Sequence, residues 1–203
     1  AVLEEVVQAA ERGEEATVLA WLDGGGRVDE TFEYTFGCGS RVSGMTLLML
    51  AMVHGHAELA EALLRRGADV SLQTSDGSTA LTLAAVIGHE KLVELALRHG
   101  AEIDQLDSNG CAALVGAACC GKERVVDTLI RHGAEIGPAL MFAAEANHPA
   151  VVLRLLRAGA DMALRSAGSS GRTALQIARE KGHAECVEAF RTYLGEVAVA
   201  RSK

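Results

Sequence analysis

A tripeptide of Gly, Ala and an acidic residue recurs along this chain of 203 residues. It stands at 67–69, 100–102, 133–135 and 159–161, and the first three copies are 33 residues apart. Each copy closes an amphipathic helical segment such as 56–66. A fixed period near 33 residues with two short helices per period is typical of a solenoid, in which each repeat unit contacts only its neighbours. Such a chain presents a long surface rather than a central pocket.

A second signal is a two-residue step between the two helical segments of each period. The steps are Gly55-His56, Gly88-His89, Gly121-Lys122, Asn147-His148 and Gly182-His183. Gly, and after it Asn, tolerates the positive φ that a tight turn between helices often requires. We therefore place these histidines in turns. The first helices of five periods are expected to begin near Thr46, Thr79, Ala112, Pro138 and Thr173.

The repeat resembles the ankyrin repeat. The family's G-x-T-P-L-H-x-A-A motif appears in worn form at 44–49, 77–82, 110–115 and 171–176, and its Leu is kept as Leu48, Leu81, Leu114, Leu140 and Leu175. The Pro and His of the motif are absent from these units, which implies weaker polar ties between layers. The resemblance implies an all-α ankyrin-repeat solenoid of helix-turn-helix units with short β-hairpin fingers.

We expect a single domain over 1–203 with about six repeat units. Their bounds are 3–29, 44–76, 77–109, 110–136, 137–170 and 171–194. The charged tail, 195–203, is expected to fray.

The spacing is irregular at three places. Gly13 and Gly55 are 42 residues apart, nine more than the regular step, whereas Leu114 and Leu140 are 26 apart, seven fewer. The short step leaves no room for a finger and is either a harmless deletion or a gap for a partner. A longer, flexible tip is expected at 167–171.

The long step contains an aromatic insertion at 31–41. Phe32, Tyr34 and Phe36 alternate with polar residues there, so they share one face of a strand. Insertions in repeat proteins map to loops on one face, often the binding face. This loop therefore either binds a partner or covers the exposed flank of the first unit.

The two residues before each turn form another candidate surface. They are Val53 and His54, Val86 and Ile87, and Cys119 and Cys120. In ankyrin repeats, as the resemblance implies, these positions face the concave groove beside the fingers. Exposed apolar residues there indicate an interaction site with the acidic fingers as its rim. Alternatively, these side chains are partly buried between neighbouring first helices.

Patterns typical of catalytic or metal sites are missing. The histidines do not pair with acids or cysteines at metal spacing, and no serine sits in a G-x-S-x-G elbow. The side chains of Cys119 and Cys120 would point about 100° apart on a helix, which suits neither a disulfide nor a joint metal site. We expect no enzyme activity, no metal and no cofactor.

Composition narrows the partners and the compartment. A net charge of −8 disfavours nucleic acid, and no apolar run approaches the roughly 20 residues of a membrane span. Five cysteines without paired spacing favour an intracellular setting, cytoplasmic or nuclear.

These observations predict a non-catalytic, monomeric module that binds a partner protein on its concave finger-and-groove face. Two alternatives stay open. The chain could be a scaffold or targeting segment of a larger multidomain regulator or enzyme, or a self-associating array.

Overall fold

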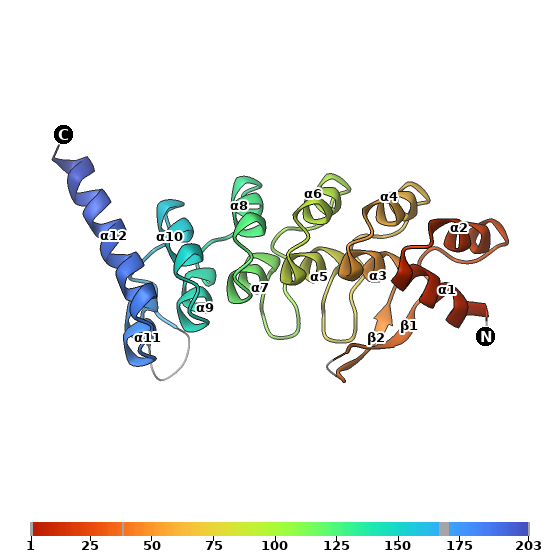
Figure 1. Ribbon diagram of the computed structural model, residues 1–203, viewed down its shortest axis with the longest axis horizontal. Helices are drawn as coiled ribbons and strands as arrows, with labels where there is room; N and C mark the ends of the chain where they lie inside the picture. Colours follow the sequence, from red (N-terminus) through yellow and green to blue (C-terminus); the bar gives the residue numbers. More distant parts are fainter. Residues whose placement is uncertain (1, 38, 167–170, 203) are drawn as a thin grey trace. The chain divides into compact units, whose positions relative to one another are not determined.

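The computed structural model describes residues 2–37, 39–166 and 171–202, and these are mostly helical (Figure 1). The twelve helices in this part of the chain are α1 Val2–Arg12, α2 Glu15–Asp23, α3 Leu47–His54, α4 Ala57–Arg65, α5 Ala80–Ile87, α6 Glu90–Arg98, α7 Ala113–Cys119, α8 Glu123–Arg131, α9 Ala139–Glu145, α10 Pro149–Arg157, α11 Ala174–Glu180 and α12 Ala184–Arg201. A hairpin of β1 (Phe32–Thr35) and β2 (Arg41–Met45) lies between α2 and α3. The fold is therefore an all-α repeat fold, as predicted.

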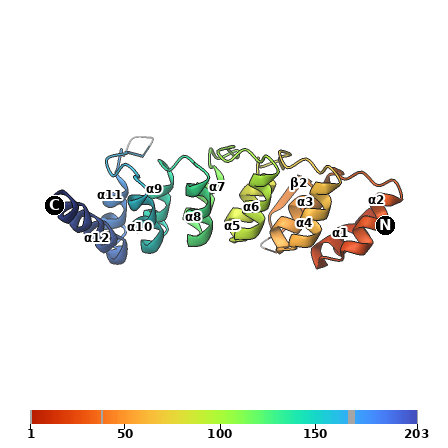
Figure 2. The same cartoon turned by 90° about the horizontal axis from the view of Figure 1, so that it is seen from above.

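The chain divides into two compact halves. The N-terminal half, Ala1–Cys111, contains α1 to α6 and the hairpin, and the C-terminal half, Ala112–Lys203, contains α7 to α12. Within the N-terminal half the first helices α1, α3 and α5 pack side by side, and the second helices α2, α4 and α6 form a parallel row (Figure 2). The loops that follow α4 and α6 extend past the first row, on the side away from the second helices (Figure 1).

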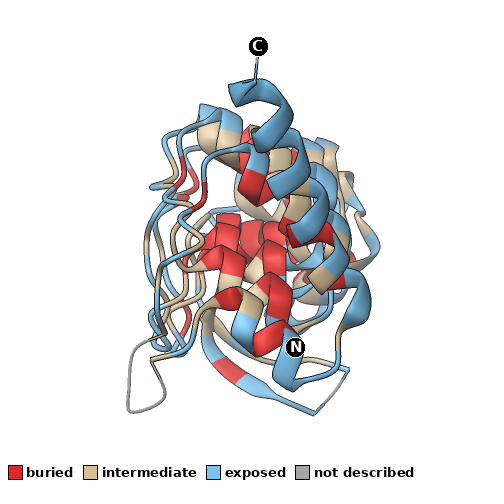
Figure 3. Cartoon of the chain, turned by 90° about the vertical axis from the view of Figure 1, so that its left-hand side faces the viewer, coloured by how far each residue is buried: buried red, intermediate tan, exposed pale blue. Residues whose placement is uncertain are grey.

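Aliphatic side chains, many of them Leu and Met, fill the space between the helices. Every residue from Leu47 to Met52 in α3 is buried, and Leu81, Leu92 and Leu114 are at most 2% exposed. Figure 3 shows that the buried positions are concentrated on the helices. The motif leucines at Leu48, Leu81, Leu114 and Leu140 thus belong to the core, whereas the fifth, Leu175, is only half-buried.

The predicted starts of the first helices are confirmed. Thr46, Thr79, Ala112, Pro138 and Thr173 are the residues directly before α3, α5, α7, α9 and α11. The Thr46 hydroxyl accepts a hydrogen bond from the Met49 amide at 3.2 Å, and Thr79 forms a reciprocal capping box with Thr82. Ala112 lacks a hydroxyl and makes no such bond.

The turn histidines join successive helix pairs inside each half. Their ring nitrogens donate to carbonyl oxygens at 2.7 to 3.2 Å, His56 to Glu11, His89 to Val53, His148 to Cys119 and His183 to Ala144. Gly55 permits this approach, because a Cβ there would lie 2.8 Å from the His89 ring. Asn147 has a φ of 61°, which fits its predicted place in a turn.

The loops and the C-terminal tail differ in part from what the sequence predicts. In the described residues, strands occur in β1 and β2, with one isolated bridge between Arg165 and Thr173. The loops after α4 and α6 consist of turns and irregular segments, so the expected β-hairpin fingers are not confirmed there. The frayed tail is wrong for 195–201, because α12 continues to Arg201 and Arg157 binds Glu196 at 3.1 Å. The tip at 167–170, like Cys38 and Lys203, lies outside the described residues.

Candidate protein-binding surface

The aromatic insertion folds as a hairpin with one partly covered face. β1 and β2 are antiparallel, with Phe32 opposite Met45 and Tyr34 opposite Val42. Half-buried and exposed residues alternate along β1, so Phe32 and Tyr34 face the protein while Glu33 faces solvent, as the sequence predicts. Phe36 follows the strand and is also half-buried. The Tyr34 and Phe36 rings meet edge to face with their centroids 5.1 Å apart.

Tyr34 connects the hairpin to the end of a helix. Its hydroxyl lies 3.2 Å from Nε2 of His54, the last residue of α3. Burial of the phenol and the neighbouring Glu11 carboxylate raise the pKa of Tyr34 to about 12. The hydroxyl therefore keeps its proton to a higher pH than an ordinary tyrosine does. The aromatic insertion and the helix-end residues, two separate candidates in the sequence, meet here in one place.

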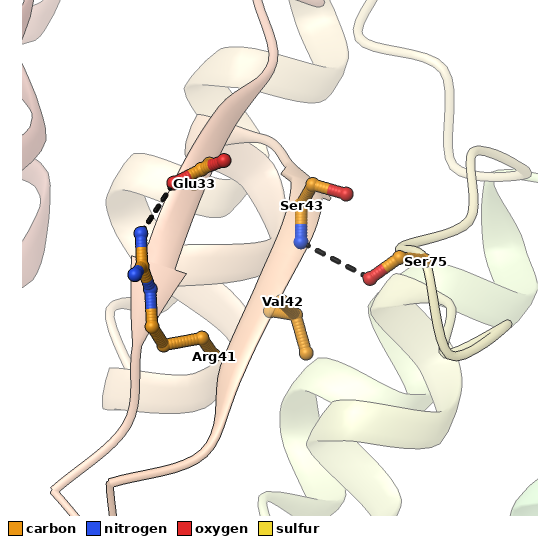
Figure 4. Close-up of a pocket in the computed structure, with 5 residues that line it drawn as sticks. All are labelled: Glu33, Arg41, Val42, Ser43 and Ser75. Carbon is orange, nitrogen blue, oxygen red and sulfur yellow. Dashed lines mark hydrogen bonds and ion pairs between the residues drawn. The ribbon is translucent and has the colours of Figure 1, made fainter.

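The hairpin is also attached to the loop after α4 (Figure 4). The Ser43 amide donates to Ser75 Oγ at 3.1 Å, and the Ser75 amide donates to the Ser43 carbonyl at 2.8 Å. Beside this contact Glu33, Arg41, Val42, Ser43 and Ser75 line an open pocket of about 370 Å³. Arg41 and Glu33 are 2.6 Å apart across it, so its two charges compensate each other.

The loops after α4 and α6 are joined in the same way. We call these loops, residues 67–78 and 99–111, the fingers. The amide and hydroxyl of Ser108 both donate to the Asp76 carbonyl, at 3.0 and 2.6 Å. Gly77 has a φ of +79°, and a Cβ there would lie 2.7 Å from the Ser108 nitrogen. Glycine is therefore needed for this close approach, and the hairpin and the two fingers form one hydrogen-bonded series.

Aspartates organise the turns of the fingers. Asp107 Oδ1 accepts from the amides of Asn109 and Cys111 at 2.8 and 2.9 Å, and Asp69 accepts from the Ser71 amide at 2.8 Å. Hydrogen bonds from Ser71 lower the pKa of Asp69. Backbone amides thus hold both carboxylates at fixed places.

The helix-end residues of the N-terminal half differ in exposure. Val86 and Ile87 at the end of α5 are 38% and 44% exposed, and His54 is exposed. Val53 is half-buried, and its carbonyl receives the His89 hydrogen bond. Leu106, in the second finger, is 56% exposed. It was not identified from the sequence as a candidate binding residue. The available signal was a large aliphatic residue among acids in a turn-rich loop.

Cys119 and Cys120 belong to the C-terminal half. Both are exposed at the end of α7, and their thiols are free. Burial raises the pKa of the Cys119 thiol, and Cys120 and Glu145 act in the same direction. Among the described residues no three His, Cys, Asp or Glu side chains are grouped so that they could hold a metal ion.

Charge is distributed unequally between the halves. Residues 1–111 contain 18 Asp and Glu against 7 Lys and Arg, a net charge of −11, whereas residues 112–203 contain 9 against 12, a net charge of +3. The fingers contain five acids and no Lys or Arg. In the described part of the chain no helix is both long and apolar enough to span a bilayer.

Comparison with known proteins gives the family. A model of ankyrin repeats in three copies matches residues 47–139 and 140–198. No curated protein matches the chain at a significant level. Ankyrin repeats generally serve as protein–protein interaction modules and are typically non-catalytic. Because the matched residues make up well over half of the sequence, the chain belongs to the ankyrin-repeat family.

Proposed function

We propose that this chain is a non-catalytic module that binds a partner protein through its N-terminal half. The binding face consists of the exposed His54, Val86 and Ile87 together with the parts of the half-buried Phe32, Tyr34, Phe36 and Val53 that solvent still reaches, and the fingers form its rim. Cys119 and Cys120 occupy the matching positions in the C-terminal half and form a second contact region of the same kind.

The main support for this proposal is the solvent exposure of Val86 and Ile87. All the other helical positions of α5 are buried or half-buried, whereas these two aliphatic side chains face solvent. Covering such area by a partner is favourable by roughly 25 cal/mol per Å². The Tyr34–His54 contact adds aromatic area next to a helix end, and aromatic residues often dominate binding.

The hydrogen bonds around this face further support binding. Ser43 with Ser75, and Asp76 with Ser108, fix the hairpin and the fingers before a partner arrives. A preformed surface loses little conformational entropy on association, so more of the contact energy appears as affinity.

The larger arrangement that we propose is one intracellular domain of six repeat units, with the partner on the concave finger-and-groove side. The successive helix pairs, α1 with α2 through α11 with α12, agree with this count. The partner is a protein rather than a nucleic acid, since acids outnumber Lys and Arg by 27 to 19.

A matched pair of substitutions tests the function. Ile87→Glu places a charge on the binding face, and Leu194→Glu places the same charge on α12, where Leu194 is similarly exposed at 48%. Full chains are immobilised, and proteins captured from a lysate are quantified by mass spectrometry. We expect proteins that bind the wild type and Leu194→Glu, but bind Ile87→Glu at least about tenfold less. Equal capture by all three folded chains would refute this face as the site.

A further inference from the structure

Building on the proposed function, we infer that the binding face recognises an apolar protein segment flanked by Lys and Arg. The apolar side chains of the face provide the contact, and the charges around them define the partner. The N-terminal half has a net charge of −11, although the whole chain has −8. The negative charge is thus concentrated in the half that carries the face.

The excess of negative charge is clearest in the fingers. Their acids are Asp69, Asp76, Glu102, Asp104 and Asp107, and they contain no Lys or Arg. The neighbouring helices α3 and α5 contain no Asp, Glu, Lys or Arg at all. A partner on this face therefore meets apolar helix ends with negative charge along one side.

The basic residues of the N-terminal half lie elsewhere or are neutralised. Arg41, on the hairpin, is paired with Glu33 at 2.6 Å. Arg65 and Arg66 lie at the end of α4, where they pair with Glu61 and Asp23, each at 2.6 Å. Lys91 and Arg98 are on α6. The two others, Arg12 and Arg27, pair with Glu14 and Glu30. The second row of helices, not the finger side, thus carries most of the positive charge.

Fixed carboxylates make this charge pattern selective. Asp107 and Asp69 are held by backbone amides, so a basic side chain finds them already in place. Opposite charges raise the association rate and fix the register of a complex, and like charges exclude wrong partners. An acidic segment with the same apolar residues would be repelled by a half of charge −11.

The test uses a displayed library of random 12-residue peptides, selected on the full-length folded chain. Enriched sequences are synthesised, and their affinities are measured at about 50 and 300 mM salt, a range over which screening of exposed charges increases strongly. Two charge reversals are compared. Glu102→Lys changes a finger, and Glu58→Lys makes the same change on α4, on the other row of helices.

We expect the enriched peptides to combine aromatic or aliphatic residues with an excess of Lys and Arg, and to bind more weakly at high salt. Glu102→Lys should weaken binding by about three- to tenfold, while Glu58→Lys should change it by less than about twofold. Helical circular dichroism and melting of both variants confirm that they are folded.

Two results overturn the inference in distinguishable ways. Neutral or acidic peptides that bind independently of salt, yet are lost with Ile87→Glu, would refute the basic partner and leave the binding face intact. Peptides that are unaffected by Ile87→Glu, or no enrichment at all, would refute the binding face itself. A concentration-dependent dimer that Ile87→Glu dissociates in light scattering would replace the basic segment by a second copy of the chain.

Discussion

The two halves of the chain use the same kind of helix pair but differ in what connects the pairs. In residues 1–111 a β-hairpin and two fingers follow the second helices and bind each other through Ser43, Ser75, Asp76 and Ser108. In residues 112–203 the link from α8 to α9 is only 132–138. Exposed ion pairs join neighbouring helices in both halves, such as Arg66 with Asp23 at 2.6 Å in the first and Arg154 with Glu123 at 2.9 Å in the second.

Under the proposed function, this difference separates the residues that stabilise the fold from those that recognise a partner. Both halves bury a largely aliphatic core of Leu, Val and Ala, and that core defines the helices. Exposed ion pairs contribute at most about 1 kcal/mol each, so they add little to the C-terminal half. The hydrogen-bonded loops of the N-terminal half instead create a fixed, acidic surface. Two halves with similar cores can therefore have different tasks.

The largest expected effect tests the shared core. Leu81→Ala in α5 and Leu114→Ala in α7 remove side chains that are 1% and 0% exposed. Each should lower the free energy of unfolding of its own half by roughly 2–5 kcal/mol, because a cavity remains. Amide hydrogen exchange followed by mass spectrometry reads each half separately. Unchanged exchange around either leucine would show that it is not in the core.

The next effect concerns the contact between the fingers. Gly77→Ala introduces a Cβ 2.7 Å from the Ser108 nitrogen at a φ of +79°, and should cost about 2–4 kcal/mol. Gly110→Ala is the control, because its φ of +75° is equally strained but no atom lies within 4 Å of the new Cβ. It should cost about 1–2 kcal/mol. If urea denaturation gave the same loss of unfolding free energy for both variants, the fingers would not be in close contact at Gly77.

A smaller effect comes from a difference in helix capping. Thr79→Ala removes the capping box of α5 and should cost about 1 kcal/mol. The reverse change, Ala112→Thr, supplies the missing hydroxyl at the start of α7 and should stabilise it by a similar amount. Thermal melts of both variants measure the difference. If both changes destabilise, local capping does not distinguish these helices.

The smallest effect at neutral pH is that of Tyr34→Phe. Losing this partly exposed hydrogen bond should lower the free energy of unfolding by about 0.5 kcal/mol. Its pH dependence is more informative. The pKa of Tyr34 is about 12 in the folded chain and about 10 when unfolded, so its contribution is full below about pH 10 and is lost as the pH rises through 12. Wild-type stability should fall more steeply than that of Tyr34→Phe over this range. Absorbance at 295 nm measures the ionisation directly, and a Tyr34 that ionises near pH 10 would contradict the structure.

Features that depend on local chemistry could be read from the sequence. A hydroxyl before a helix, a Gly or Asn in a turn and a leucine at a fixed period act within a few residues, so Thr79, Asn147 and Leu114 were placed correctly. The alternation of Phe32 and Tyr34 with polar residues likewise predicted the two faces of β1.

Features that depend on distant contacts could not be read in this way. Ser43 and Ser75 are 32 residues apart, and neither belongs to a motif that predicts their hydrogen bonds. Tyr34 reaches His54 only because the hairpin returns to the end of α3. The helical tail was missed because a charged terminal segment usually frays, whereas here Glu196 is held by Arg157.

The comparison between the halves is tested most directly by hydrogen exchange of the full chain with and without a bound peptide from the library or a captured partner. We predict slower exchange at 32–36, at the ends of α3 and α5, and at 99–111. The second helices α4 and α6 should remain unchanged. Protection of α4 and α6, with no change at 32–36 and 86–87, would contradict the assignment of recognition to the finger side of the N-terminal half.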